Sequence, residues 1–490
     1  MKTSSAYPSE GMWIPTGLLS WGLLLGFVVC AFLKPVGAIL FLLVFDLYWL
    51  LFLFYTLILF CCSQVLLKRG RAMDWTQKID QARFPSDAPP VGELFHVVLM
   101  PVSSESLENV KRRLENLCSL QFDKQRVLVF FAMADSTHPQ VKNAIWDFHR
   151  EQHETFAASY ISPFEVMKGN PVSTGANLNA AAQMVRHVLS RKGIEEGKAL
   201  VTCLDSSGSL DPQFLSCLSY HFLSCPDRQR RGFRPVTVCA SNFWGRRAHT
   251  TMWNFAGLMS VVFDRIHPYS LGSFSRQSLS FATLSALGFW PETDAAEDCA
   301  LYWKARLFFN GEYQVLPLQL PHCLNFDVPE EGNSGFYKTF SRNMQWAMGM
   351  KSGAGLVFSE DAALERSFGW KLGLWLKVLL MQQTATLWAF IFVWLGWLPG
   401  MAAVMGLHSS VAYYMAPRIL VIIGMLSLLS FVVTFMLCRL ARPPFLQTHT
   451  FFFRLRQRVW FWLLPLTLPL FSCVPLLAVQ TRMLFKKGRR

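Results

Sequence analysis

The sequence predicts an α/β domain that lies between two hydrophobic ends. Residues 68–365 are largely polar, whereas the segments before and after them consist mainly of long apolar runs. Inside the polar region, short continuous apolar runs alternate with segments whose apolar residues recur at helical spacing. This alternation is typical of an open sheet whose strands are joined by helices. We therefore expect an N-terminal transmembrane hairpin in residues 1–67, a cytosolic domain in 68–365, and an amphipathic interface helix with transmembrane helices in 366–490.

The N-terminal hairpin is indicated by two apolar runs, residues 12–33 and 36–60, that are separated only by Lys34 and Pro35. Each run reaches the roughly 20 residues that a helix needs to cross a bilayer. A cleaved signal peptide is not expected, because the second run follows at once and no small-residue cleavage site precedes it. The basic cluster at 68–71 then lies in the cytosol by the positive-inside rule.

The C-terminal end is longer and less regular. Residues 366–398 are too many for one span, and we expect an amphipathic helix on the membrane surface followed by a span at about 378–398. A second span is expected at about 416–438, which places the arginines of 439–458 in the cytosol. The last apolar run, 459–480, contains three prolines and is followed by five basic residues. A fifth span and a re-entrant or surface-lying segment both remain open.

The formal net charge of +14 raises the question of nucleic-acid binding. Many of the basic residues flank hydrophobic spans, at 68–71, 439–458 and 482–490, where they face anionic lipid headgroups. No nucleic-acid-binding motif is present, so we expect membrane lipids and no nucleic acid as partners. The twelve cysteines are scattered without a metal-type spacing, and a cytosolic domain keeps them reduced.

Three apolar runs, residues 94–100, 127–131 and 200–204, predict buried strands of the central sheet. Asp135 and Asp205 lie just beyond the ends of the second and third runs. Open sheets of this type bind ligands at the carboxyl ends of their strands, so both carboxylates are candidates for a nucleotide site. The residues after the first run, with apolar side chains at 107, 110, 114 and 117, predict a helix.

Asp205 begins the segment Asp-Ser-Ser-Gly-Ser-Leu-Asp-Pro, which also has the composition of an ordinary turn. A turn with a capping carboxylate and a nucleotide or metal site are both compatible with this segment. We expect the next helix to begin near Pro212, with Asp211 as its N-cap.

An acidic pair, Glu297 and Asp298, opens a segment whose apolar residues recur at helical spacing. Asn310 and Gly311 are a stop signal, and residues 313–316 predict a short strand. Carboxylates at a helix start are stabilised in their ionised form by the helix dipole. An ionised carboxylate at this position can accept a proton.

The order of these motifs along the chain resembles that of the membrane-bound glycosyltransferases of family 2, the inverting nucleotide-sugar enzymes that include cellulose, chitin and hyaluronan synthases. The resemblance covers about residues 92–350, and the hydrophobic ends extend it to nearly the whole chain. It implies a GT-A fold, a Rossmann-like nucleotide-sugar domain. The motifs that carry the resemblance are, in order, strand-Pro101, strand-Asp135, Ala176-Asn177-Leu178-Asn179, strand-Asp205, Gly272 to Arg276, Glu297-Asp298 and Arg342 to Trp346.

The resemblance implies a role for each matching residue. In that family the acidic pair carries the catalytic base, which implies that Asp298 deprotonates the acceptor hydroxyl while Glu297 orients it. Asp205 matches the first aspartate of the motif that holds a divalent cation, Mn²⁺ or Mg²⁺, and the diphosphate. The remaining matches are Asn177 and Asn179 on a helix that packs under the nucleotide, Asp135 at the nucleoside, Arg342 near the leaving diphosphate, and Gln345 and Trp346 at the acceptor.

This chain departs from the family pattern at three places. Ser207 stands where the family usually has a second aspartate, which removes an anionic oxygen and weakens the metal site. Thr174 replaces a lysine that could face the diphosphate. Arg342 and Gln345 are exchanged relative to the processive enzymes, and Trp346 suits either a sugar-stacking role or an interfacial anchor.

The sequence therefore predicts transfer of a sugar from a nucleoside diphosphate donor to a glycan or lipid-linked acceptor at the cytosolic membrane face, with inversion. A catalytically silent, glycosyltransferase-like scaffold remains the alternative, which Ser207 and Thr174 favour. A transporter is the weakest reading, because the spans show no repeated halves and carry little charge apart from Asp46. His322 could bind a metal or phosphate, although a satisfied loop histidine is the better expectation.

Overall fold

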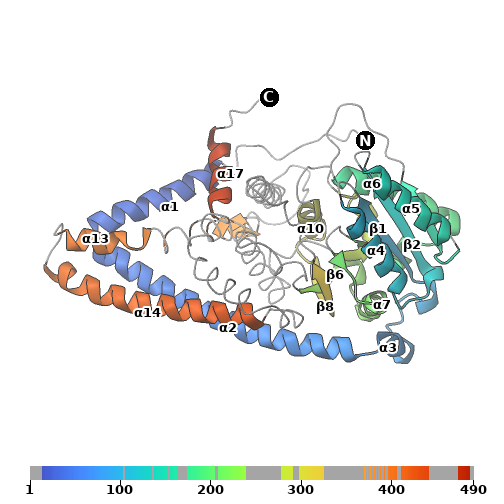
Figure 1. Ribbon diagram of the computed structural model, residues 1–490, viewed down its shortest axis with the longest axis horizontal. Helices are drawn as coiled ribbons and strands as arrows, with labels where there is room; N and C mark the ends of the chain where they lie inside the picture. The colour runs from blue at the N-terminus through green and yellow to red at the C-terminus, as the bar shows by residue number, and fades with distance from the viewer. Residues whose placement is uncertain are drawn as a thin grey trace.

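The structure is a computed structural model. It describes residues 14–102, 105–134, 137–152, 154–162, 174–204, 208–238, 277–290, 297–324, 410–440 and 473–485, together with part of 369–405. A sheet domain occupies one side of the molecule, and long helices extend away from it on the other (Figure 1).

The long helices begin with α1 (Ile14–Leu33) and α2 (Pro35–Ala72), which meet at Lys34 and form the expected hairpin. Helix α2 continues beyond residue 60 through the basic cluster, because no residue there breaks it. In the described part of the chain, two segments are long and apolar enough to cross a membrane, Pro35–Ala72 and Pro417–Leu437. The apolar part of α1, Gly17–Leu33, is shorter.

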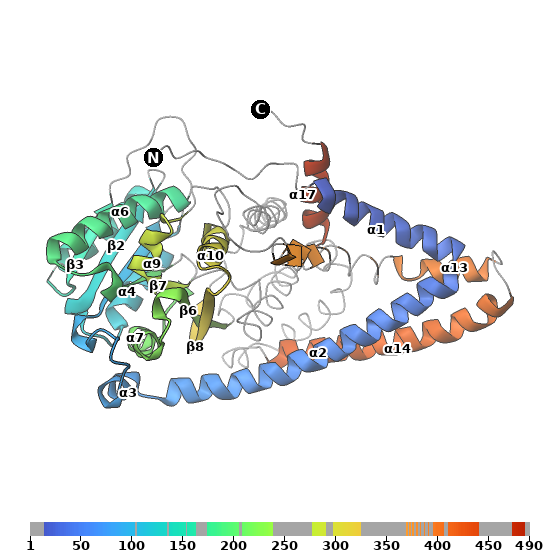
Figure 2. The same ribbon diagram turned by 180° about the vertical axis from the view of Figure 1, so that it is seen from behind.

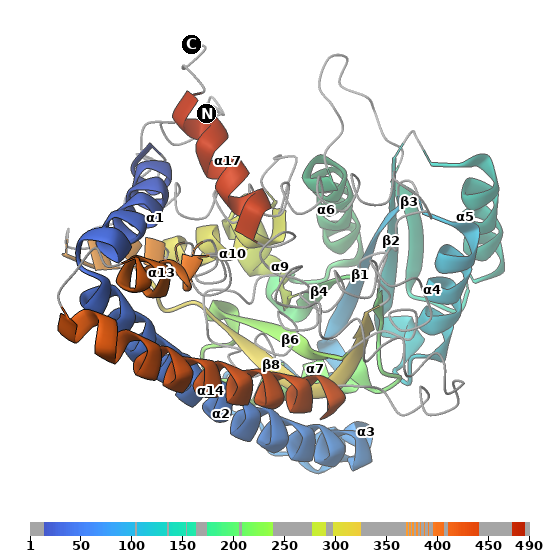
Figure 3. The same ribbon diagram turned by 60° about the vertical axis from the view of Figure 1, so that its left-hand side comes forward.

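Helix α14 (Ser410–Leu440) lies along α2 in all three ribbon views (Figures 1, 2 and 3). Ile39 packs against Ile419 and Ile423, whereas Leu53 and Phe60 further along α2 pack with Val433 and Leu437. Residue numbers increase together along both helices, so the two helices run parallel. Their basic C-terminal ends therefore lie at the same end of the pair.

Two polar contacts join the apolar helices. Ser427 of α14 donates a hydrogen bond of 3.1 Å to the buried carboxyl group of Asp46 on α2. Ser20 of α1 bonds the side-chain amides of Gln383 and of Gln480, the latter on α17 (Val474–Phe485). Buried polar side chains between apolar helices act as specific contacts, because the apolar surroundings offer them few other partners.

The sheet has eight strands in the order β3-β2-β1-β4-β7-β6-β8-β5. Strands β1 to β4 are parallel, β7 runs antiparallel to β4 and to β6, and β8 is parallel to β6. The fold is thus mixed α/β with a sheet that is mainly parallel. The strand bounds are β1 Phe95–Val102, β2 Val127–Met133, β3 Ala158–Ser162, β4 Ala199–Cys203, β5 Gly208–Ser209, β6 Arg231–Val238, β7 Ser278–Ser280 and β8 Gln314–Leu324.

Helices cover both faces of this sheet. On one face, α4 (Leu107–Ser119), α5 (Pro139–Glu151) and α7 (Phe214–Ser224) pack on alternate strand residues such as Val98 and Met100. On the other face, α6 (Thr174–Lys192), α9 (Phe281–Ala286) and α10 (Glu297–Phe308) pack on Val97 and Leu99. Burial on both faces explains why these strands are continuous apolar runs rather than alternating ones.

The predicted strands at 94–100, 127–131 and 200–204 are confirmed as β1, β2 and β4, and the helix expected after the first strand is confirmed as α4. The start of α10 at Glu297 is confirmed as well. Asn310 and Gly311 have φ of 55° and 84°, so the expected stop adopts the left-handed conformation that ends helices.

Two predicted details were wrong. Helix α7 begins at Phe214, near Pro212 as expected, but its N-cap is Gln213 rather than Asp211. The carboxylate of Asp211 accepts the backbone N–H of Gln213 at 3.0 Å, so it closes a turn before the helix instead of capping it. Strand β8 extends from Gln314 to Leu324, well past residue 316, because its long pairing with β6 continues across a bulge.

Helix α2 abuts the sheet domain directly. A Cβ atom on Gly70 would overlap the carbonyl oxygen of Gln319 in β8, so only glycine fits at this crossing. Helix α3 (Trp75–Gln81) follows, and the Trp75 indole N–H donates back to the carbonyl of Gly70 at 2.9 Å. These contacts join the end of α2 to the sheet without a free linker.

Candidate functional site

The sheet has a topological switch point at the carboxyl ends of β1 and β4. Strand β1 pairs with β2 on one side and with β4 on the other, and the chain order reverses between these neighbours. Ligands of open α/β sheets bind in the crevice at such a point, because loops leave it in opposite directions. The predicted candidates can therefore be placed by their relation to this edge.

Asp135 lies outside the described residues, but both of its flanks return to the end of β1. The backbone N–H of Ala134 donates to the carbonyl of Val102 at 2.9 Å, and the Thr137 hydroxyl donates to the same oxygen at 3.2 Å. Val102 is the last residue of β1, so Ala134 and Thr137, on either side of Asp135, both lie at the carboxyl edge.

Asp205 also lies outside the described residues, and the residue before it is held firmly. The backbone N–H of Leu204 donates to Leu99 of β1 at 2.8 Å. The carbonyl of Leu204 accepts a bond of 3.1 Å from the guanidinium of Arg113, which also donates to the carbonyl of Pro101 at 3.3 Å. One cation thus bridges the carboxyl ends of β1 and β4.

Arg113 is a functional candidate that the sequence interpretation missed. Its side chain is only 2% exposed and forms an ion pair of 2.5 Å with Glu105, which is 8% exposed. A buried arginine is unusual unless it is paired, and this one lies at the switch point. The signal was visible, because Arg113 interrupts the apolar face of α4 between Val110 and Leu117.

Helix α6 brings the predicted Asn177 and Asn179 to the same side. This helix follows β3 and runs against the parallel strands, so its first turns lie toward the carboxyl edge. The amide of Asn179 makes two bonds to the backbone of Trp290, donating to its carbonyl at 2.7 Å and accepting from its N–H at 2.9 Å. Asn177 is 6% exposed, and its amide oxygen has no hydrogen-bond partner among the residues that the structure describes.

The acidic pair Glu297 and Asp298 occupies the first turn of α10, and both residues are partly buried. Their direction follows from the topology: a tight turn at Gly311 leads from α10 straight into the amino end of β8. Strand β8 points the same way as β1, so the start of α10 lies on the carboxyl side of the sheet. The clamp between Asn179 and Trp290 holds the chain seven residues before Glu297.

The other predicted contacts, Arg342, Gln345 and Trp346, lie outside the described residues, as does Ser207. Among the residues that the structure describes, no three His, Cys, Asp or Glu side chains gather as a metal site would require. His322 is buried inside β8, opposite Thr237 of β6, rather than in a loop after the strand. That part of the prediction is corrected, because β8 is longer than the sequence suggested.

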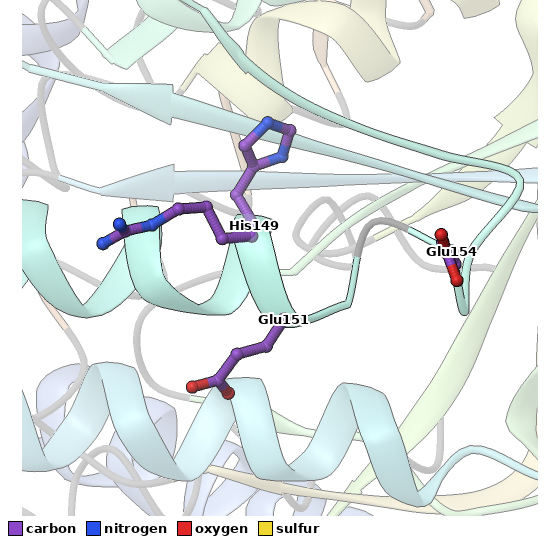
Figure 4. A pocket seen from close by; sticks show the side chains of 4 residues that line it. His149, Glu151 and Glu154 are labelled. Atoms are coloured by element: carbon purple, nitrogen blue, oxygen red, sulfur yellow. The ribbon is translucent and has the colours of Figure 1, made fainter.

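A surface pocket at the end of α5 lies at the opposite edge of the sheet. It is lined by His149, Arg150, Glu151 and Glu154. Ala157, three residues later, bonds the carbonyl of Val127 at the amino end of β2. The labelled side chains point in different directions rather than toward one ligand (Figure 4). This pocket is therefore separate from the candidate site.

No family model matches the sequence, and no curated protein matches it. Among solved structures, the chain is similar to the mannosyltransferase PcManGT from Pyrobaculum calidifontis in complex with GDP-Man and Mn²⁺, with 12% identity, a TM-score of 0.44, and coverage of 91% of this chain and 100% of that one. It is also similar to S. aureus TarS 1–349 in complex with UDP-GlcNAc, with 13% identity, a TM-score of 0.38, and coverage of 60% and 73%. Likenesses at this level establish neither a family nor an activity.

Proposed function

We propose that this protein is a membrane-integrated, inverting glycosyltransferase that moves a sugar from a nucleoside diphosphate donor to a hydroxyl acceptor. The observation that supports the proposal is that the described residues flanking Asp135 and Asp205, and the start of α10, lie at one edge of the sheet. The flanks of Asp135 and of Asp205 are bonded to the ends of β1 and β4, and α10 begins on the same side. A nucleotide site and a general base are then available together.

In the proposed reaction, Asp298 takes the proton of the acceptor hydroxyl, and Glu297 orients that hydroxyl. The acceptor oxygen forms a bond to the anomeric carbon as the bond from that carbon to the phosphate oxygen breaks. The nucleoside diphosphate leaves with the electron pair of the broken bond. Asp135, Asn177 and Asn179 belong to the donor side of this site, whereas Gln345 and Trp346 belong to the acceptor side.

Charge on the leaving diphosphate needs compensation, because it develops while the bond breaks. The donor set at residues 205–207 is one carboxylate and two hydroxyls, which suits a hard cation that shares its coordination with phosphate oxygens. Asp205 would hold Mn²⁺ or Mg²⁺ there, and the cation would neutralise the diphosphate. Arg342 is the proposed protein cation for the same charge.

The membrane helices place this chemistry at the cytosolic face in our proposal. Helices α2 and α14 run parallel, and basic residues follow the apolar part of each, at 68–71 and 439–442. The sheet domain follows α2 without a linker and so lies on the positively charged side. Asp46 is engaged by Ser427, which fits a helix contact better than a transport pathway.

The test is a screen of nucleotide sugars for hydrolysis and transfer by the purified full-length protein with Mn²⁺ or Mg²⁺. We expect turnover with at least one donor and inhibition of that turnover by the nucleoside diphosphate product. Nucleotide binding without turnover of any donor would favour the silent scaffold, which Ser207 and Thr174 suggest. Neither binding nor turnover would overturn the proposal.

A further inference from the structure

Helix α4 holds both ends of the segment that contains Asp205. At the first end, Arg113 donates to the carbonyl of Leu204. At the second end, the amide of Asn116 donates to the carbonyl of Leu210 at 2.9 Å and accepts from the Leu210 N–H at 2.8 Å. Arg113 and Asn116 are three residues apart and so project from neighbouring positions on one side of the helix.

We propose that Arg113 and Asn116 are positioning residues, a two-point clamp that sets where Asp205 meets the diphosphate of the donor. The inference rests on the proposed function. Both residues bond backbone groups on either side of residues 205–207, Arg113 at Leu204 and Asn116 at Leu210. Because only five residues lie between Leu204 and Leu210, fixing both ends is expected to restrict the conformations open to the chain between them.

The clamp is itself fixed from both sides. Glu105, which pairs with Arg113, lies just before Ser106, whose hydroxyl accepts the Asn109 N–H at the start of α4. After α4, the backbone N–H of Gln121 donates to the carbonyl of Pro212 at 2.7 Å, two residues beyond Leu210. Leu204, Leu210 and Pro212 are thus each bonded to α4 or to the chain that directly follows it.

The chemistry of each clamp residue matches this role. The Asn116 amide pairs with both the N–H and the carbonyl of Leu210. Alanine at position 116 would therefore leave these two partly buried backbone groups without their partner. Arg113 uses a planar fork to reach Pro101, Leu204 and Glu105 together, which the single ammonium of lysine cannot reproduce.

The experiment compares Asn116→Ala with Asn109→Ala in the full-length protein. Asn109 is a matched control on the same helix, because its amide oxygen bonds only Arg112 within α4. Binding of UDP and GDP is titrated at fixed Mn²⁺, and backbone hydrogen exchange is measured over residues 204–212. We expect faster exchange there and a roughly tenfold weaker nucleotide affinity in Asn116→Ala alone, the scale of one or two lost hydrogen bonds.

A second comparison, of Arg113→Lys with Arg112→Lys as its control, tests the inference independently if Asn116→Ala folds poorly. Arg113→Lys should raise the donor KM and the Mn²⁺ requirement while kcat at saturating donor changes little, whereas simple loss of folded protein would lower kcat without moving KM. Unchanged affinity and KM in both clamp variants would overturn the inference. If the wild-type protein binds no nucleotide, the proposed function fails, and exchange over 204–212 still decides whether the clamp exists.

Discussion

At the start of α10, two carboxylates share a helix end that favours their ionised form. Both lie in the first turn, where the backbone N–H groups and the helix dipole stabilise negative charge. Asp298→Asn keeps the shape of the side chain and removes its basicity. We expect turnover to fall by about a hundredfold to ten-thousandfold, the usual contribution of a general base, while donor affinity stays close to wild type.

The measurement is kcat together with donor Kd. Glu312→Gln is the matched control, because Glu312 lies beyond the other end of the helix and pairs with Arg230 on the surface. Near-normal turnover in Asp298→Asn would remove Asp298 from the role of base.

The single carboxylate at residues 205–207 leads to a second prediction at this scale. Hard cations prefer anionic oxygen, so Ser207→Asp should lower the Mn²⁺ or Mg²⁺ concentration needed for nucleotide binding, and Asp205→Asn should raise it. A cation titration of UDP and GDP affinity in the wild type and both variants measures this. If a chelator leaves wild-type affinity unchanged and neither variant shifts it, nucleotide binding does not use a metal.

Packing between β1 and α7 makes stability depend on pH. His96 of β1 is fully buried and shares a hydrogen bond of 2.8 Å with Ser219 of α7. Burial, with a smaller effect from Arg126, lowers the pKa of His96 to about 3, so its ring stays neutral in the fold. In the unfolded chain the ring takes up a proton near pH 6.5, and the fold binds fewer protons than the unfolded chain between these values.

The contribution of His96 to the free energy of unfolding is therefore fully present above pH 6.5. It decreases as the pH falls toward 3, by up to about 1.4 kcal/mol per pH unit. Denaturant unfolding at pH 5 and pH 7 should show this loss in the wild type and less of it in His96→Gln. His187→Gln, at an exposed position of α6, should behave like the wild type. Part of the pH dependence of stability will persist in His96→Gln, because burial also lowers the pKa of His221 to about 4. An equal pH dependence in His96→Gln and wild type would contradict the assignment.

Helices α6 and α10 are coupled through the backbone of Trp290. Asn179→Ala removes both bonds to Trp290 and leaves two buried backbone groups unpaired, at a cost of about 1 to 3 kcal/mol to this contact. Because the freed chain leads into Glu297 and Asp298, we expect kcat to fall more than donor affinity. Asn143→Ala on the exposed side of α5 is the control. A fall in donor affinity alone would instead favour direct contact between Asn179 and the nucleotide.

Strands and helices differ in how far the sequence could predict them. Strands β1, β2 and β4 are buried on both faces, so their continuous apolar runs were sufficient to find them. Strand β7, Ser278–Ser280, is too short to show any period, and its antiparallel position between β4 and β6 depends on contacts far apart in the chain. The hydrogen bonds of Asn116 and Asn179 could not be predicted from the sequence either, because their partners are 94 and 111 residues away along the chain.

At the scale of the whole molecule, the parallel pairing of α2 with α14 constrains the topology. Two parallel spans enter a membrane from the same side, so the chain after Ala72 and the chain after Leu440 emerge on one face. In the membrane topology that we propose, the basic residues that follow each helix predict that this face is cytosolic. Met405, which is exposed just before α14, then belongs to the opposite face.

Cysteines introduced at Gln77 and Thr448 should resist a membrane-impermeant thiol reagent in intact cells and react after permeabilisation. A cysteine at Met405 should react in both conditions, and the unsubstituted protein gives the background from its native cysteines. Labelling of position 77 without 448, or the reverse, would contradict the parallel pairing itself. Labelling of both in intact cells would leave the pairing in place but invert the orientation, and the sheet domain with its acidic edge would then face away from cytosolic nucleotide sugars.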